Sequence, residues 1–259
     1  MTTSTVGFVG GGRVTRILLQ GFEHGQMMPP KVVVSDPDAT ALERLGRRFS
    51  RIIPALDDNA RAAAQRVVIL AVHPPVMAEV LAQIRPVLQP DAIVVSLAPK
   101  FTIARLSGLL GGFHRIVRMI PNAPSVIGLG YNPMAFSPTL SSIDRQGVIS
   151  LVASLGEHPE IEEAKLEGYA LLSGMGPTYF WFQVQVLREL AAGFGLTEEE
   201  IMPALKRTLC GATRTLLESG LTPAEVMDLV PVKPLEAMEE EIEGAYRSRL
   251  PALYQKIKP

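Results

Sequence analysis

The chain has 259 residues, of which 47% are hydrophobic and 20% are charged; this composition is typical of a globular protein and excludes extensive disorder. Its 25 basic and 26 acidic residues give a formal net charge of −1, so no excess of charge points to a nucleic acid or an anionic membrane as a partner. No apolar run is long enough to span a bilayer and no signal peptide precedes the first strand, so we expect a cytoplasmic protein.

The first predicted element is a short apolar strand at residues 6–9, which leads through a glycine turn into an amphipathic helix. Glycines at such a turn leave backbone N–H groups at a helix N-terminus, with no Cβ to keep a pyrophosphate away from them. Thr15 stands where a third glycine or an alanine is usual, and it is small enough for close packing of helix and strand. The turn predicts a dinucleotide site at Gly10, Gly11, Gly12, Arg13 and Val14.

A second strand supports this interpretation, because a glycine turn alone also serves ordinary tight turns. Residues 31–36 form an apolar run that ends in Ser35 and Asp36. In a dinucleotide-binding fold the adenosine ribose lies at the end of this strand. Both polar residues are therefore candidates for contact with the nucleotide.

Strands and helices then alternate along the chain. We expect strands at residues 66–72, 92–96 and 115–119, and helices at residues 38–49, 60–64, 76–84 and 101–110. The strands are continuous apolar runs, the pattern of strands that are buried on both faces of a parallel sheet. This alternation predicts an α/β fold with a doubly wound parallel sheet, whose ligand lies outside the carboxyl ends of the strands. Ser96 and Asn122 lie at two of those ends.

From about residue 160 the pattern changes to helices only. These are expected at residues 162–172, 177–194, 198–217, 223–229 and 236–257, the last interrupted or kinked at Pro251. The change predicts a dinucleotide-binding Rossmann-type domain at residues 1–159 and an all-helical domain at residues 160–259. Cys210, the single cysteine, is expected to be an ordinary buried residue, and the four histidines lack ligand spacing, so we expect no metal site.

Four segments, taken in their order and spacing, resemble the pyrroline-5-carboxylate reductases along nearly the whole chain. They lie at residues 7–12, 70–74, 118–124 and 173–179. The resemblance implies reduction of a cyclic imine with NAD(P)H, and a helical domain that forms a homodimer or a higher homo-oligomer. It also implies that the second domain contributes to the substrate site.

The family's functional positions fall on matching residues of this chain. By resemblance, the nucleotide is held by Gly10, Gly11, Gly12, Ser35, Asn59, Ala71, Val72, His73 and Pro74. The substrate is contacted by Ser173, Gly174, Gly176 and Thr178, with Ser96, Asn122 and Lys100 around the nicotinamide.

Several positions depart from the family pattern. His73 replaces a lysine, and Asp36 suits the 2′-hydroxyl of NAD better than the 2′-phosphate of NADP, although Arg13 or Arg61 offers a compensating charge. We therefore expect NADP as the cofactor and keep NAD as an alternative. Residues 99–100 read Pro-Lys where the family has Ala-Gly.

The largest departure is at residues 231–236, where Pro-Val-Lys-Pro-Leu-Glu replaces the family's Ser-Pro-Gly-Gly-Thr-Thr loop. The replacement removes hydroxyl and N–H donors that hold the substrate carboxylate in the family. Lys233 or Lys100 offers a point charge instead. Two other functions stay open: a catalytically silent nucleotide-binding sensor or assembly protein, and a two-domain 2-hydroxyacid dehydrogenase, for which Lys165 is the available acid–base group.

Overall fold

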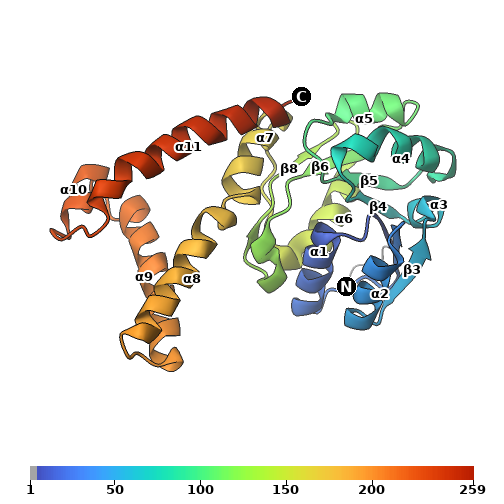
Figure 1. Ribbon diagram of the computed structural model, residues 1–259. Helices are drawn as coiled ribbons and strands as arrows, with labels where there is room; N and C mark the ends of the chain where they lie inside the picture. Colours follow the sequence, from blue (N-terminus) through green and yellow to red (C-terminus); the bar gives the residue numbers. More distant parts are fainter. Residues whose placement is uncertain (1–4) are drawn as a thin grey trace. The chain divides into compact units, whose positions relative to one another are not determined.

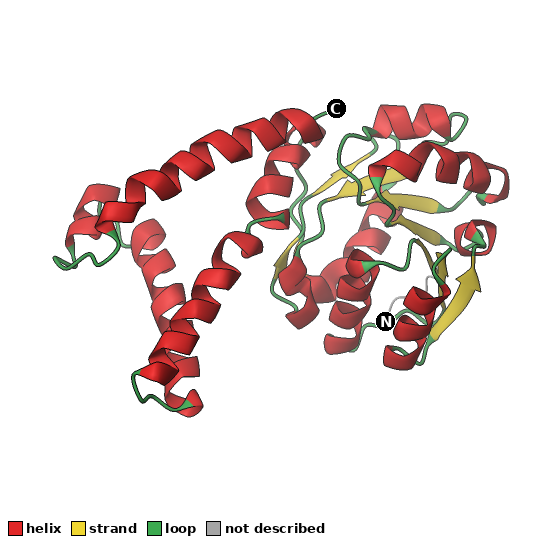
Figure 2. Ribbon diagram, viewed as in Figure 1, coloured by secondary structure: helices red, strands yellow, loops and turns green. Residues whose placement is uncertain are grey.

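The computed structural model describes residues 5–259, so the first four residues of the predicted nucleotide domain lie outside its description. The chain forms two compact units, one comprising Met1–Met175 with Leu253–Pro259 and the other Gly176–Ala252. Figure 1 labels the elements of both, and Figure 2 shows that the strands belong to the first unit and that the second is helical.

The first unit is built on a seven-stranded sheet in the order β3-β2-β1-β4-β5-β6-β8. Every neighbouring pair is parallel except β6 with β8, which is antiparallel. The strands are β1 (Val6–Val9), β2 (Val32–Asp36), β3 (Ile52–Leu56), β4 (Val67–Leu70), β5 (Ile93–Ser96), β6 (Ile116–Met119) and β8 (Met134–Phe136).

Helices cover both faces of this sheet, as Figure 2 shows. Side chains alternate along each strand, so that Val32 and Val34 pack on one face and Val33 packs on the other. The first face is covered by α1 (Arg13–His24), α2 (Ala39–Arg48) and α6 (Ser142–Val152), and the second by α3 (Asn59–Ala63), α4 (Met77–Ile84) and α5 (Ile103–Leu109). The predicted doubly wound α/β sheet is confirmed.

Several elements of the first unit were not predicted from the sequence. Strand β3 contains Pro54, which argues against a strand in the middle of a sheet, but β3 lies at the edge, where a proline is tolerated. Strand β8 has only three residues and closes the opposite edge. Helix α6 carries Ile143, which is 83% exposed, so its apolar residues do not mark a single face. A short parallel pair, β7 (Gly130–Tyr131) and β9 (Gly156–Glu157), lies outside the main sheet.

The segment predicted as one helix at residues 162–172 is divided. It consists of a 3₁₀ turn at Glu163–Lys165, helix α7 (Leu166–Tyr169) and a π-helical turn at Ala170–Gly174. Leu166 and Ala170 pack with Ile120, Ala135 and Ile257 in the first unit. The compact units therefore change at Met175 and Gly176, and the division into domains after residue 159 stays a prediction.

The second unit comprises α8 (Pro177–Gly193), α9 (Glu198–Glu218), α10 (Pro223–Asp228) and most of α11 (Glu236–Ile257). Helix α11 continues through Pro251, so it is not interrupted there, and the kink that was the alternative stays a prediction. Cys210 is exposed, and its predicted burial is wrong, because no described part of this chain covers its side of α9. No helix within residues 5–259 is long and apolar enough to cross a membrane.

Candidate active site

The predicted site residues of the first unit gather at one edge of the sheet. Strands β2, β1, β4, β5 and β6 are adjacent and parallel, so their carboxyl ends meet at the same edge. The glycine turn follows β1, and the other predicted polar positions follow the neighbouring strands. This edge is where open α/β sheets bind their ligands.

The glycine turn has the backbone that its sequence requires. Gly10 has a φ of +103°, and a Cβ there would lie 2.6 Å from the carbonyl oxygen of Ala71. The buried Thr15 hydroxyl donates a hydrogen bond of 2.5 Å to the Gly10 carbonyl, so the residue that replaces the usual third glycine holds the turn in place. At Gly12, the N-cap residue of α1, no described atom lies within 4 Å of an added Cβ. The helix N-terminus therefore opens onto unfilled space.

Asp36 is held against this turn by two backbone N–H groups. Its Oδ2 accepts a hydrogen bond of 2.7 Å from the Gly11 N–H, and its Oδ1 accepts one of 2.8 Å from the Asp38 N–H. Both carboxylate oxygens are thus anchored, and the charge of Asp36 is fixed beside the glycine turn rather than free to rotate away.

Ser35 and Asn59, two predicted nucleotide contacts from different elements, are brought together. The fully buried Ser35 hydroxyl donates to Asn59 Oδ1 at 2.8 Å, and Asn59 Nδ2 donates to Gln83 Oε1 at 2.6 Å. These bonds connect the end of β2 with α3 and α4.

The ends of β4 and β5 supply the next predicted residues. The Ala71 N–H donates to the Val9 carbonyl at 2.8 Å, which keeps residues 71–72 beside the glycine turn. His73 is exposed, and Pro74 begins a 3₁₀ turn at Pro74–Val76. Ser96, at the end of β5, is 1% exposed. Lys100, four residues further on, has a left-handed backbone with a φ of +71°.

Asn122 and Ser173, which are 51 residues apart in the sequence, are in direct contact. Asn122 Nδ2 donates a hydrogen bond to the Ser173 carbonyl, and Asn122 Oδ1 accepts one of 3.1 Å from the Tyr131 N–H. The Ser173 hydroxyl donates to the Tyr169 carbonyl at 3.0 Å. The loop after β6 and the π-helical turn therefore form one hydrogen-bonded assembly.

Two tyrosines flank this assembly, and sequence analysis did not single them out. The rings of Tyr131 and Tyr169 lie with centroids 6.0 Å apart. Burial and the neighbouring Tyr169 phenol raise the pKa of Tyr131 above its ordinary value. The Tyr131 phenol therefore stays protonated at neutral pH.

The other predicted substrate residues lie on either side of the boundary between the units. Gly174 packs so closely on β6 and its loop that an added Cβ would lie 3.2 Å from Cγ2 of Ile120. Gly176 is the N-cap residue of α8, and Thr178 lies in the first turn of that helix. Gly176 and Thr178 belong to the second unit.

Sequence analysis missed a buried ion pair that connects the elements carrying the predicted site residues. Arg118, on β6, is 1% exposed and contacts Oε1 of Glu167 at 2.5 Å and Oε1 of Glu163 at 3.0 Å. The same two carboxylates accept backbone N–H groups of Lys100 (3.2 Å) and Ile103 (2.6 Å). The pair thus ties the loop after β5 to the segment that leads into Ser173. An arginine inside an otherwise apolar strand was the signal that a buried acidic partner exists.

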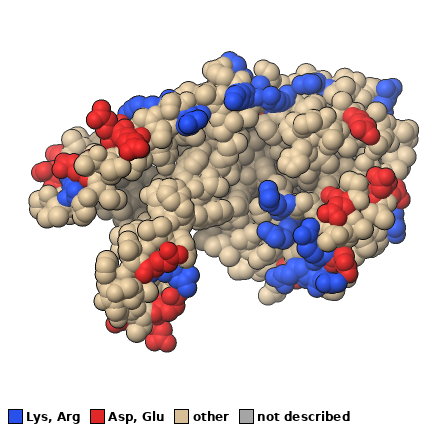
Figure 3. Space-filling model, viewed as in Figure 1, with Lys and Arg blue, Asp and Glu red and all other residues tan. Residues whose placement is uncertain are grey.

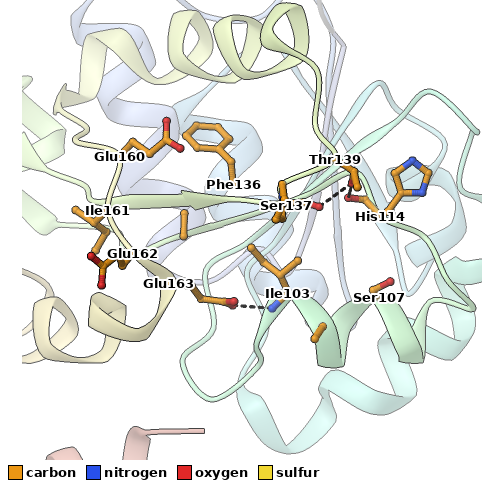
Figure 4. A pocket seen from close by; sticks show the side chains of 13 residues that line it. Ile103, Ser107, His114, Phe136, Ser137, Thr139, Glu160, Ile161, Glu162 and Glu163 are labelled. Atoms are coloured by element: carbon orange, nitrogen blue, oxygen red, sulfur yellow. Dashed lines mark hydrogen bonds between the residues drawn. The ribbon is translucent and has the colours of Figure 1, made fainter.

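A cavity of about 500 Å³ lies beside β8 and α5, away from the glycine turn (Figure 4). Glu163 reaches its wall and accepts the Ile103 N–H there, and Ser137 and Thr139 are hydrogen-bonded to each other. None of the predicted site residues is among the described residues that line this cavity.

Known proteins resemble the chain in sequence and in fold. The family model described as "NADP oxidoreductase coenzyme F420-dependent" matches residues 5–100. The pyrroline-5-carboxylate reductase of Pseudomonas aeruginosa is 28% identical over 228 residues, which cover 87% of this chain and 83% of that protein.

Two solved structures extend the similarity to the fold. A pyrroline-5-carboxylate reductase from Coxiella burnetii superposes with a TM-score of 0.69 and 26% identity, covering 98% of this chain and 94% of that one. The Plasmodium falciparum pyrroline carboxylate reductase, solved with NADP bound, superposes with a TM-score of 0.71 at 20% identity, covering 99% of this chain and 95% of that one. At this identity the second structure shows a shared fold.

Proposed function

We propose that the chain is a member of the pyrroline-5-carboxylate reductase family, to whose members it is similar over most of its length, and that it is an NADP-dependent reductase of a cyclic imine. Its substrate is 1-pyrroline-5-carboxylate or a related cyclic imine, and its product is L-proline or the corresponding cyclic amine. The observation that carries the proposal is the glycine turn, whose N-cap residue Gly12 faces unfilled space at the carboxyl edge of a doubly wound sheet.

The residues at this edge fit a dinucleotide. A side chain at Gly10 would collide with the backbone of Ala71, whereas one at Gly12 would fill the open space at the start of α1. That space is the cradle that a pyrophosphate needs. We propose that the nucleotide is held by Gly10, Gly11, Gly12, Arg13, Val14, Ser35, Asp36, Asn59, Ala71, Val72, His73, Pro74, Ser96 and Asn122.

When bound, NADPH would supply a hydride to the imine carbon. With the imine nitrogen already protonated, the C=N electron pair would stay on that nitrogen and the product would be the neutral cyclic amine. The chain's task is then to orient the imine and to exclude water. We propose that Ser173, Gly174, Gly176 and Thr178 contact the substrate.

The substrate carboxylate needs a cation, because residues 231–236 carry no hydroxyl group. Lys100 is the candidate in the first unit. Its backbone N–H is anchored to Glu167, and its left-handed conformation is one that residues other than glycine rarely adopt. Such conformations persist where the surrounding structure requires them, often at functional sites.

We also propose that the protein is a homodimer or a higher homo-oligomer that forms through the second unit. Many large apolar side chains of α8 are exposed, including Phe180, Trp181, Phe182, Leu187 and Leu190. Exposed apolar surface on this scale marks an interface. A second copy of the same helices is the partner that a symmetric association offers. We also propose that the enzyme acts in the cytoplasm, where reduced nicotinamide nucleotide is available to it.

The direct test mixes the purified protein with 1-pyrroline-5-carboxylate and NADPH or NADH, and follows loss of the reduced nucleotide together with formation of proline. Turnover supports the proposal. Binding of the nucleotide without turnover of this or any other cyclic imine contradicts it and favours a catalytically silent nucleotide-binding protein. Sedimentation over a range of protein concentrations tests the oligomer, and a monomer at all concentrations contradicts that part.

A further inference from the structure

A basic cavity of about 740 Å³ adjoins the glycine turn. It is lined by the turn itself, by α1, by the end of β2 and by α2. Figure 3 shows that blue Lys and Arg side chains gather over the region of α1 and α2. The charged residues that line the cavity are Arg13, Arg16, Asp36, Asp38, Arg44 and Arg48.

The arginines come in two pairs, each on one face of a helix. Arg13 and Arg16 are three residues apart on α1, and Arg44 and Arg48 are four residues apart on α2. Residues at these spacings are neighbours on a helix surface. Both faces line the same cavity, so four arginines and two aspartates contribute to its wall.

The acidic partners in and around the cavity do not neutralise all four arginines. Arg44 lies 3.8 Å from Asp38, and Arg48 lies 3.3 Å from Glu23. Arg13 and Arg16 form no ion pair with any residue of the described chain, 5–259. Like charges in one cavity repel each other, and a bound anion would relieve that repulsion.

Asp36 is the opposing charge. Its carboxylate faces the glycine turn, held by the N–H groups of Gly11 and Asp38. Gly11 permits this approach, because a Cβ there would already lie 3.2 Å from Cβ of Asp36. In dinucleotide sites an acidic residue at the end of this strand accepts the ribose 2′-hydroxyl, and an arginine nearby accommodates a 2′-phosphate. This chain carries both features in one cavity.

We propose that Arg13 and Arg16, assisted by Arg44, bind the 2′-phosphate of NADP, and that Asp36 limits the preference for NADP over NAD. The inference rests on the proposed function, since it assigns the residues that read the cofactor. It separates two roles: the glycine turn binds any dinucleotide, and the arginine cavity distinguishes the phosphorylated one.

The test measures binding by calorimetry and needs no turnover. Adenosine 2′,5′-bisphosphate and 5′-AMP serve as probes that differ only in the 2′-phosphate, and NADPH and NADH are compared in parallel. A charge-assisted hydrogen bond contributes about 1.5–3 kcal/mol, or roughly a 10- to 100-fold change in affinity. We expect Arg16→Ala and Arg13→Ala each to weaken binding of the 2′-phosphorylated ligands by about this factor, with binding of 5′-AMP and NADH changed less than about threefold.

Arg47→Ala is the matched control. Arg47 lies on α2 between Arg44 and Arg48, but it does not line the cavity and is paired with Glu43 at 2.5 Å. We expect this variant to bind all four ligands as the wild type does. Asp36→Ser tests the opposing charge, and it should strengthen binding of adenosine 2′,5′-bisphosphate by about 10-fold while weakening that of NADH.

Equal losses of affinity for ligands with and without the 2′-phosphate in the Arg13 and Arg16 variants would overturn the inference. The arginines would then act on the phosphate groups that both kinds of ligand share. Unchanged binding of every ligand in these variants would overturn it as well. Both outcomes leave the proposed function intact if NADPH still binds and turns over. Failure of the wild type to bind either dinucleotide would overturn the proposed function and, with it, the assignment of the cavity.

Discussion

The two units of the chain differ in the exposure of their large apolar side chains. In the first unit, Phe8 and Phe22 are 0% exposed, whereas in the second Phe182 is 64% and Phe194 is 77% exposed. Of residues 176–252, all of which the structure describes, only Gly176 and Ile201 are buried. The first unit thus buries its large apolar side chains within one chain, whereas the second leaves many of its own exposed.

This difference separates two requirements for function. The nucleotide cradle is held by bonds within the first unit, such as Thr15 to Gly10 and Gly11 to Asp36. In the second unit the proposed interface would bury exposed phenylalanines, and full burial of one such side chain contributes about 1.5–3 kcal/mol. We therefore expect stability to depend on protein concentration only through the second unit.

The largest expected effect comes from a charge on the exposed face of α8. Phe182→Glu places a carboxylate in the proposed interface, and burying an unpaired charge costs several kcal/mol. We expect the dissociation constant of the oligomer to rise at least about 100-fold, measured by analytical ultracentrifugation. Gln89→Glu, which adds the same charge at an exposed position of the first unit, is the control and should leave association unchanged. Normal association of the Phe182 variant would contradict the proposed interface.

The two units also differ in the burial of their ion pairs, and removing one partner of a buried pair and of an exposed pair tests this difference. Glu167→Ala leaves Arg118, which is 1% exposed, without one of its partners, and should cost about 3–5 kcal/mol of unfolding free energy. Glu198→Ala removes the partner of Arg188 in the second unit, where both side chains are about half exposed, and should cost about 0–1 kcal/mol. Urea unfolding measures both. Equal losses of unfolding free energy in the two variants would show that the buried ion pair does not stabilise the loop after β5.

Much of the first unit could be predicted from the sequence, because its central strands are continuous apolar runs and its glycine turn has a recognisable local pattern. The fold class followed from those local patterns, as β4 and β5 illustrate. Strand β3 did not follow, since Pro54 is acceptable only because tertiary structure puts the strand at an edge.

The site is less readable, because its supports join residues that are distant in the sequence. Arg118 and Glu167 are 49 residues apart, and no local pattern pairs them. The same holds for Asn122 with Ser173 and for Gly11 with Asp36. In the second unit the sequence predicted the helices, but the prediction that Cys210 is buried was wrong, because its neighbours in the sequence do not determine which face of the helix packs against the rest of the chain.

A smaller effect separates folding of the first unit from its proposed binding of the nucleotide. Gly10→Ala forces a Cβ onto the carbonyl of Ala71 at a positive φ, and should cost about 1–3 kcal/mol of stability. Gly12→Ala meets no described atom within 4 Å and should change stability by less than about 0.5 kcal/mol. We nevertheless expect Gly12→Ala to weaken NADPH binding by at least about 10-fold, measured by calorimetry. Unchanged affinity in a folded Gly12 variant would place the pyrophosphate elsewhere.

The smallest effect is one of pH and is confined to the first unit. Burial opposes ionisation of Asp144, but hydrogen bonds from Ser141 and Arg115 and the charge of Arg66 outweigh it, so the pKa of this carboxyl lies below its ordinary value. The Arg115 guanidinium is 2.7 Å away. A carboxyl whose pKa is lowered by folding stabilises the protein above its unfolded pKa of about 3.9, and this contribution disappears as the pH falls through the folded pKa.

Asp144→Asn should therefore lower the unfolding free energy by about 1–2 kcal/mol at pH 7 and by less at pH 3, so the difference between variant and wild type narrows as the pH falls. Glu225 supplies the contrast in the second unit. Its pKa is also lowered, by hydrogen bonds from the backbone and hydroxyl of Thr222, but the pair is exposed. Water and salt screen exposed charges. We therefore expect the difference in unfolding free energy between wild type and Glu225→Gln to change less between pH 7 and pH 3 than the difference for Asp144→Asn does. Denaturant unfolding at the two pH values measures both variants, and a gap for Asp144→Asn that stays constant with pH would show that its ion pairs do not stabilise the folded first unit.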